Sequence, residues 1–513
     1  MVTPQESWHQ HDLPLVNRLA QSAYRDHAAF YAPGHKQGQG APTVMWQLLG
    51  DRHALKADLP ELPELDNLFA PEGVIQAAQA LAAAAFGANQ TWFLTNGSTC
   101  GIEAAILATC GPGDRVLLPR NVHRSAILGL ILSGAMPIFV DPDYDPDWDM
   151  AHGVAVEAIA HALKTYSDIK AILIVSPTYY GTCADVGAIA HLAHQHNIPL
   201  IVDEAHGPHF GFHPDLPASA LSAGADIVIQ STHKVLSAMT QASMLHLGFG
   251  GQPHGPDRVQ PQRISAALQL VQSTSPNYLL LASLDAARHQ MATDGHKLMQ
   301  HTLDLADYAR TELQRLIGLR IFAAVDHSNR AGIAAGDRTR LTVDVSGLRL
   351  TGFEADDILH TQLGVTAELP TQQHLTFIIS LGNTRTDIDR LIHAFQQLQA
   401  QGQGKADGGR PTAAAQTIEK TVTRPLHRFY IPTVSPRDAF FAPVKPVAIA
   451  QAIGHISGEL ICPYPPGIPL IMPGEVITAE IVEQLRAIAL AGGVITGCAD
   501  ASLGTLGIID GNP

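Results

Sequence analysis

Residues 225–234 read "ADIVIQSTHK", an apolar run that ends in two hydroxyl side chains, a histidine and a lysine. A continuous run of Ile and Val is typical of a strand that is buried on both faces of a sheet. Lys234 follows this strand almost directly, although an unpaired charge is costly to bury. The stretch therefore predicts a buried strand and raises the question of what the lysine binds.

Upstream of this stretch, short apolar runs alternate with amphipathic segments such as "DVGAIAHLAHQHN". Strands that alternate with helices are joined by crossover connections, and this pattern predicts an α/β domain with a mostly parallel sheet. We place this large domain at residues 66–300. The expected strands carry the following sequences: "TWFLT" (91–95), "DRVLLP" (114–119), "MPIFV" (136–140), "KAILIVS" (170–176) and "IPLIVD" (198–203).

The segments outside this large domain differ in composition, which predicts further domains and a linker. Prolines interrupt residues 1–65, for which we expect an extended arm with one early helix. Residues 301–399 contain a helical pattern followed by "RLTVDVSGL" and "LTFIIS", which predicts a smaller α+β domain. Residues 400–420 are rich in Gly, Ala and Gln and predict a linker. A C-terminal domain built on turns is expected at residues 421–513.

Bulk properties exclude several classes of protein. The 513-residue chain has a formal net charge of −15, which argues against binding to nucleic acid or to an anionic membrane surface. No apolar run reaches the roughly 18 residues that a membrane span requires, and the N-terminus lacks the pattern of a secretory signal. A cytoplasmic location is the expectation. The five cysteines are scattered, so we expect reduced thiols and no metal site.

Candidate site residues follow the ends of the predicted strands, where ligands bind in open α/β sheets. Gly97, Ser98 and Thr99 follow one strand and begin a helix, an arrangement that suits a phosphate but is also an ordinary helix cap. Asp203 ends another strand, where a salt bridge or a cap is the simpler interpretation. Lys234 alone would be an ordinary surface lysine.

Together, a phosphate cradle, a strand-end acid and a strand-end lysine are the three groups that pyridoxal phosphate requires. Further segments resemble the group III Orn/Lys/Arg decarboxylases in the same order along nearly the whole chain, and the shorter biosynthetic arginine decarboxylases of bacteria in particular. These segments are "PGHKQG", "TNGSTCGIEAAI", "PRNVHRSAILG", "SPTYYG", "VDEAHGPHF", "STHKVLSAMTQAS", "STSPNYLLLASLDAAR", "PRDAFFA" and "YPPGIPLIMPGE". The resemblance implies the fold type I of pyridoxal phosphate enzymes, with a mostly parallel seven-stranded sheet.

The resemblance also implies roles for individual residues. Lys234 would be the Schiff-base lysine, Asp203 the partner of the pyridinium nitrogen, and His123 the residue stacked on the cofactor ring. The phosphate would lie against Gly97, Ser98, Thr99 and Ser231, while Ala205, His206 and His233 would line the same pocket. Both His233 and Lys234 are candidates for the residue that donates the proton to Cα.

Two further sets of residues concern partners and substrate. Thr274 and Ser275 lie in "QSTSPNY", which resembles a segment that completes the phosphate site of a second subunit, so we expect a homodimer with shared sites, and assembly into higher oligomers stays open. A guanidinium needs a carboxylate partner, for which Glu368 and Glu475 are candidates, although each could be an ordinary surface or cap residue.

The expected activity is decarboxylation of a basic amino acid, with L-arginine converted to agmatine and CO₂, a step of polyamine biosynthesis. Lysine or ornithine as substrate stays open. An aminotransferase or an aldolase-type lyase would share Lys234 and Asp203, but the C-terminal third offers no arginine motif for an α-carboxylate. A non-catalytic regulatory relative would not need the intact cofactor residues.

Overall fold

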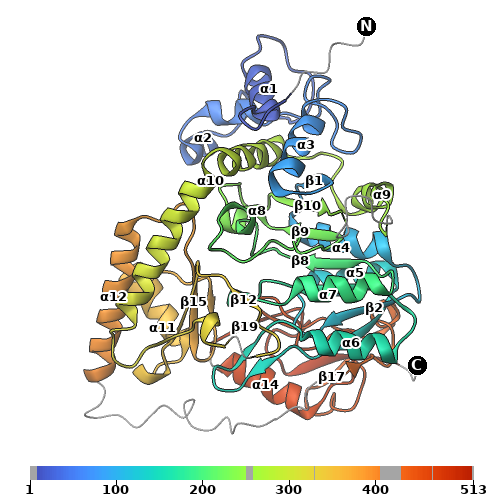
Figure 1. Cartoon of the computed structure of the whole chain (residues 1–513), viewed down its shortest axis with the longest axis vertical. Helices are drawn as coiled ribbons and strands as arrows, with labels where there is room; N and C mark the ends of the chain where they lie inside the picture. Colours follow the sequence, from blue (N-terminus) through green and yellow to red (C-terminus); the bar gives the residue numbers. More distant parts are fainter. Residues whose placement is uncertain are drawn as a thin grey trace. The chain divides into compact units, whose positions relative to one another are not determined.

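The strands predicted to be buried on both faces occur where the sequence places them. The computed structural model describes residues 8–249, 258–327, 330–404, 429–464, 466–490 and 492–510 (Figure 1). Contacts divide the chain into two units: the first is residues 1–108 and 202–299, and the second is residues 109–201 and 300–513. Among the described residues, none of the helices is both long and apolar enough to cross a membrane.

The first unit contributes four strands in the order β1-β10-β9-β8, and β10 is antiparallel to both of its neighbours. Every residue of β8, β9 and β10 is buried, as expected from their uninterrupted apolar sequences. These strands are β1 (Gln90–Leu94), β8 (Leu200–Asp203), β9 (Ile227–Gln230) and β10 (Ser243–Leu247). Its helices are α1 (Pro14–Ala23), α2 (Thr43–Leu49), α3 (Val74–Phe86), α4 (Gly97–Thr109), α8 (Thr232–Val235) and α9 (Pro261–Val271), and α10 (Tyr278–Leu313) begins in this unit and ends in the second.

The N-terminal segment contains more helix than the one early helix expected for it. Helix α2 begins directly after Pro42, and the 3-10 helix η1 (Arg52–Ala57) follows. A proline is compatible with the start of a helix, because the first helical N–H groups have no partner within the helix. The prolines in this segment therefore limit the length of its helices without preventing them.

The second unit contributes the strands in the order β6-β2-β3-β16, and β2 is parallel to both β3 and β6. They are β2 (Arg115–Pro119), β3 (Met136–Val140), β6 (Ile169–Val175) and β16 (Phe429–Tyr430). The helices that alternate with them are α5 (Arg124–Ser133), α6 (Val156–Thr165) and α7 (Val186–Gln195). Short paired strands complete this part: β4 (Tyr144–Asp145), β5 (Met150–Ala151), β7 (Thr182–Cys183) and β12 (Ala335–Gly336).

The sheet has eight strands, in the order β1-β10-β9-β8-β6-β2-β3-β16, where seven were expected. The additional strand is β16, which pairs antiparallel with β3 through Phe429 and Tyr430. A strand of two residues has no detectable periodicity in the sequence, because alternation needs several residues to be recognised.

The C-terminal half contains an antiparallel sheet of four strands, in the order β11-β13-β15-β14. The core beside it includes Leu341, Val343, Leu375 and Phe395. Its elements are β11 (Arg320–Ile321), β13 (Arg340–Asp344), α11 (Gly352–Ile358), β14 (Leu369–Pro370), β15 (His374–Ile378) and α12 (Arg385–Gly404). The predicted boundary at residue 300 falls inside α10.

The last part of the chain has a core of its own, which includes Ile461, Ile471, Leu485 and Ile508. Its elements are α13 (Pro436–Phe441), β17 (Val444–Ala448), β18 (Cys462–Tyr464), α14 (Ala479–Leu490), β19 (Val494–Thr496) and β20 (Thr505–Ile509). Of the predicted linker, residues 405–420 lie outside the described residues, and the domain boundaries stay predictions.

Candidate functional site

The predicted acid and lysine follow neighbouring strands of the first unit. Asp203 ends β8, is buried, and accepts a hydrogen bond from the N–H of Ala205 at 3.1 Å. Lys234 lies in α8, four residues after β9. Burial raises the pKa of the Asp203 carboxyl, and the charge of Lys234 opposes this shift. The two groups are therefore close enough to interact electrostatically.

Lys234 contacts one of the histidines predicted to line the pocket. Its Nζ lies 2.9 Å from Nε2 of the buried His206. His206 follows Asp203 by three residues, so the end of β8 supplies both the acid and a neighbour of the lysine.

The predicted phosphate cradle brings together residues at the start of α4 and the residue that precedes α8. Gly97 begins α4 with φ +77°, a backbone conformation that glycine adopts without strain. The hydroxyl of Ser231 donates to Oγ of Ser98 at 2.7 Å, which joins the segment after β1 to the segment after β9. Thr99 lies in the first turn of the same helix. Hydroxyl groups thus gather beside the free N–H groups of a helix start, as phosphate binding requires.

Other predicted residues have clear local partners. Nδ1 of His233 lies 2.9 Å from the carbonyl oxygen of Ala242, and its backbone N–H donates to the same oxygen. Burial lowers the pKa of His233.

Thr274 and Ser275 are exposed beyond the end of α9, as a segment that reaches another subunit would be.

In the second unit, His123 caps α5, and its Nδ1 accepts a hydrogen bond from the N–H of Ser125 at 3.2 Å. A Cβ atom added to Gly467 would lie 3.3 Å from Nε2 of His123, so this glycine allows a close approach to the ring.

The two carboxylates expected to bind the distal cation lie in different settings within this unit. Glu475 is buried and forms an ion pair with Arg120 at 2.9 Å. The same carboxylate accepts the N–H of Met472, which favours a structural role over contact with a substrate. Glu368 is exposed and borders a groove of about 420 Å³.

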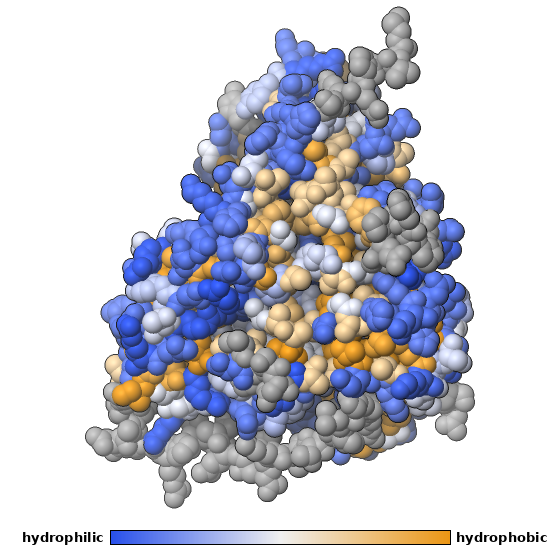
Figure 2. Space-filling model, in the orientation of Figure 1, coloured by the Kyte–Doolittle hydropathy of each residue, from blue (hydrophilic) through white to orange (hydrophobic). Residues whose placement is uncertain are grey.

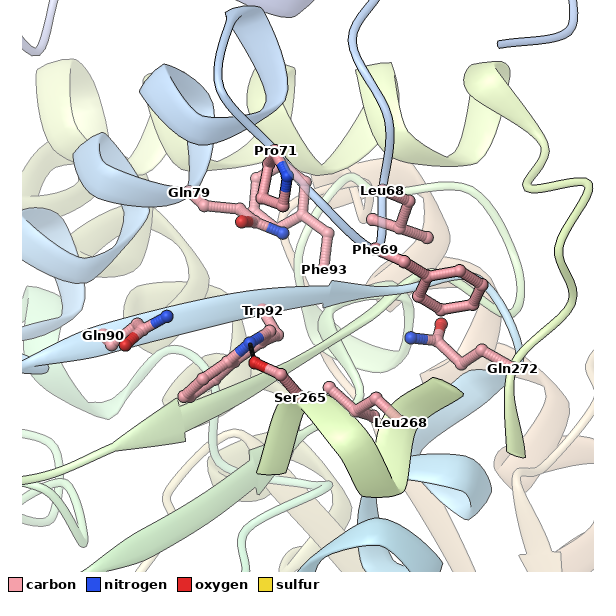
Figure 3. Close-up of a pocket in the computed structure, with 10 residues that line it drawn as sticks. All are labelled: Leu68, Phe69, Pro71, Gln79, Gln90, Trp92, Phe93, Ser265, Leu268 and Gln272. Atoms are coloured by element: carbon pink, nitrogen blue, oxygen red, sulfur yellow. Dashed lines mark hydrogen bonds between the residues drawn. The ribbon is translucent and has the colours of Figure 1, made fainter. Parts of the chain in front are cut away.

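A separate small cavity of about 70 Å³ lies in the first unit (Figure 3). In Figure 3 the side chains of Gln79 and Gln272 lie on opposite sides of it, and Trp92 donates to Ser265 at 3.1 Å. Gln272 also accepts the N–H of Thr95, which lies two residues before Gly97. The cavity therefore adjoins the segment that leads into the cradle, but none of the predicted site residues lines it.

Comparison with known proteins identifies the family of the chain. A family model described as "Orn/Lys/Arg decarboxylase, major domain" matches residues 13–334, and the model of the corresponding C-terminal domain matches residues 418–497. The chain belongs to the Orn/Lys/Arg decarboxylase family.

Individual relatives cover nearly the whole chain. An arginine decarboxylase of Bacillus subtilis (strain 168) is 36% identical over 505 residues, which is 98% of each chain. A lysine decarboxylase of Pseudomonas aeruginosa is 26% identical, with 90% of this chain and 73% of the relative covered. The solved structure of lysine decarboxylase A from Pseudomonas aeruginosa has a TM-score of 0.80 at 22% identity, covers 97% of this chain and 80% of that one, and shows the shared fold.

This decarboxylase acts on a basic amino acid, a small-molecule substrate, and its cofactor is pyridoxal phosphate. The first unit fits the cofactor. Oγ1 of Thr232 is buried and has no hydrogen-bond partner among the described residues. Buried hydroxyl groups normally have hydrogen-bond partners. Thr232 directly follows Ser231 and precedes Lys234 by two residues, so its hydroxyl group is placed to donate to a bound ligand.

Residues outside the prediction also contribute to the site's surroundings. Glu204 and Gln230 flank Asp203 and Ser231 and hydrogen-bond to each other at 2.7 Å. The sequence places each of them beside a predicted site residue, but nothing in it indicates that the two side chains meet.

Proposed function

We propose that the chain converts L-arginine to agmatine and CO₂ in polyamine biosynthesis. The observation that carries the chemistry is the convergence of Asp203, Lys234 and the Ser98–Ser231 hydroxyl pair after neighbouring strands. Arginine is favoured by the full-length similarity to the arginine decarboxylase of Bacillus subtilis.

Each residue of the first unit has a separate task. Lys234 supplies the amine that binds the cofactor's aldehyde carbon, and Asp203 holds a proton on its ring nitrogen. Asp203 would stay ionised beside a protonated ring nitrogen, because a buried carboxylate without a cation is costly. When bound, pyridoxal phosphate accepts the electron pair released as the bond between Cα and the carboxylate breaks.

The cradle holds the phosphate. Gly97 lets the backbone approach closely, and Ser98, Thr99 and Ser231 offer hydroxyl donors. Ala205 and His206 are proposed to line the pocket beside Lys234. His123 keeps the ring-stacking role that the family resemblance assigns to it, and the proton donor stays open between His233 and Lys234.

One assay tests the substrate assignment. The purified protein, saturated with pyridoxal phosphate, is offered arginine, lysine and ornithine separately, and the amine product is identified. Agmatine formed with the highest kcat/KM supports the proposal. Preference for lysine or ornithine would contradict the arginine assignment, and a keto acid product in place of CO₂ and amine would contradict decarboxylation.

We further propose that the protein is a cytoplasmic homodimer with shared sites. Apolar side chains are exposed in the first unit, including Phe30, Val44, Leu48 and Leu270. Figure 2 shows apolar surface around α3 in the same unit. Helix α2 buries none of its residues within the chain, so a second copy would shield its apolar side chains from water.

Mixing two inactive variants tests the shared site. Lys234→Ala removes the lysine, and the combined change Thr274→Val and Ser275→Ala removes the two hydroxyl groups expected to act in the other subunit. Activity recovered on mixing would support shared sites, because a mixed dimer has one intact site. Two inactive variants that stay inactive after subunit exchange would contradict them.

A further inference from the structure

Four buried polar side chains form a hydrogen-bonded row across the strands of the first unit. Glu204 accepts from the amide of Gln230 at 2.7 Å, and the amide oxygen of Gln230 lies 3.1 Å from Nε2 of His246. Nδ1 of His246 lies 2.8 Å from the hydroxyl of Thr91. Each of these residues has at most 1% of its surface exposed.

The row has a consistent pattern of donors and acceptors. If Nε2 of His246 carries the proton, it donates to Gln230, and Nδ1 is then free to accept from Thr91. The second oxygen of Glu204 accepts the N–H of Ala220 at 2.7 Å. Burial lowers the pKa of His246 to about 3, so the imidazole is neutral. Phe86 stacks on this ring at 5.1 Å between centroids.

The row connects the strands that carry the cofactor residues. Glu204 follows Asp203 directly at the end of β8, and Gln230 directly precedes Ser231 at the end of β9. Thr91 lies on β1, which leads into the cradle at Gly97. The strands that deliver the acid, the lysine and the phosphate cradle are therefore tied together by side chains as well as by the sheet itself.

We propose that Glu204 and Gln230 are positioning residues, which hold the acid at the end of β8 at a fixed place relative to Ser231 and Lys234 after β9. The inference rests on the proposed function, since it assigns these residues to the same cofactor site. Neither side chain needs to touch the cofactor or the substrate.

The energetics favour such a role. An apolar residue in place of Glu204 would leave the donors of Gln230 and Ala220 buried without acceptors, so the two strand ends would have to shift or admit water. A displacement of about 1 Å at a reacting group can lower a rate by about a hundredfold.

The test compares Glu204→Leu, Glu204→Gln and Gln230→Met with the wild-type protein. The affinity for the cofactor and the visible absorbance band of the lysine-bound cofactor are measured in the absence of amino-acid substrate. The values of kcat and KM are then measured with substrate. We expect Glu204→Leu to weaken cofactor binding, alter the band and lower kcat by about 10- to 100-fold with little change in KM. Glu204→Gln keeps a hydrogen-bond acceptor, so it should retain most of the wild-type cofactor affinity and kcat.

Gln230→Met breaks the same connection from the other side, so it should reproduce the kcat loss of Glu204→Leu. The double variant should lose little more, because both changes remove one interaction. Gln230→Met also decides the question if Glu204→Leu does not fold.

Thr342→Val serves as the matched control. It removes a buried hydrogen bond between neighbouring strands of the antiparallel sheet in the second unit, the contact of Thr342 with Thr376 at 2.9 Å. Its kcat and absorbance band should equal those of the wild type.

A folded, cofactor-saturated Glu204→Leu or Gln230→Met variant with wild-type band and kcat would overturn the inference. If the wild type forms no amine from any basic amino acid, the proposed function fails instead. The cofactor affinity and band, which need no substrate, would still decide the role of the row.

Discussion

Two pairs of acidic and basic side chains in the first unit can be compared: Asp285 with Arg288, and Asp203 with Lys234. Asp285 and Arg288 form an ion pair in which both side chains are fully buried. Asp285 also accepts the N–H groups of Leu15 and Val16, at the start of α1. Burial raises the pKa of Asp285, as it does for Asp203, but the partners of the two carboxyl groups differ.

Arg288 holds the N-terminal segment by donating to the carbonyl oxygens of Gln10 and Asp12. A guanidinium stays charged and donates in a planar fork, which suits a permanent structural contact. Lys234 has an amine that can lose its proton and act as a nucleophile. The arginine pair joins helix α10 to the N-terminal segment, whereas we propose that Lys234 and Asp203 act in the reaction.

The largest effect is expected from Lys234→Ala. This variant should lose the visible absorbance band and lower kcat by roughly a thousandfold or more, because the nucleophile itself is removed. Lys445→Ala is the control, since Lys445 pairs with Asp510 at an exposed position. Substantial turnover by Lys234→Ala would contradict the proposed catalytic role of Lys234.

Asp203→Asn should bind the cofactor but lower kcat by about 10²- to 10⁴-fold, because a neutral amide does not keep the ring nitrogen protonated. Titration of the cofactor into the variant, followed by steady-state kinetics, separates binding from turnover. Near-normal kcat would show that Asp203, like Asp285, is mainly structural.

Arg288→Met should lower the free energy of unfolding by about 3 to 5 kcal/mol, because it leaves Asp285 buried without its cation. Chemical denaturation of the cofactor-free protein measures this change. The folded fraction should keep a normal absorbance band after the cofactor is added. A large change of the band in folded protein would indicate that the pair also acts on the site.

Glu204 is a third buried carboxyl group, and it differs from Asp203 and Asp285 because its hydrogen-bond donors, Gln230 and Ala220, are neutral. The stability of the protein should therefore depend on pH through Glu204. Burial raises its pKa to about 8, so the folded protein binds this proton more tightly than the unfolded chain. The resulting stability is complete below about pH 4.5 and is lost as the pH rises through about 8.

Relative to Glu204→Gln, the wild type should therefore lose at least about 1 kcal/mol of unfolding free energy between pH 5 and pH 8. Denaturation of both proteins in matched buffers measures the difference. A difference that does not change with pH would mean that Glu204 is ionised throughout this range.

Several site features could be predicted because they depend on short segments. Continuous apolar runs predicted β8 and β9, and the proposed site residues Asp203, Ser231 and Lys234 lie at the ends of these strands or just after them. Because ligands bind at the carboxyl ends of strands in such sheets, the order of these segments, together with the family resemblance, was sufficient to propose the site residues.

Other features depend on residues that are distant in the sequence. Arg120 and Glu475 are 355 residues apart, and only their contact shows that the carboxylate is already paired. The eighth strand, β16, was missed because two residues carry too little pattern to predict pairing with β3.

The sequence by itself determined the α/β class through its local hydrophobic periodicity, and the family through its motifs, and it gave the candidate cofactor residues that we propose. The tertiary structure alone decided which buried polar groups pair. Glu204 with Gln230, and Asp285 with the start of α1, join separate segments whose hydrogen bonds exist only after packing has excluded water. Packing thereby gives each buried carboxyl group its own set of partners, which the sequence does not show.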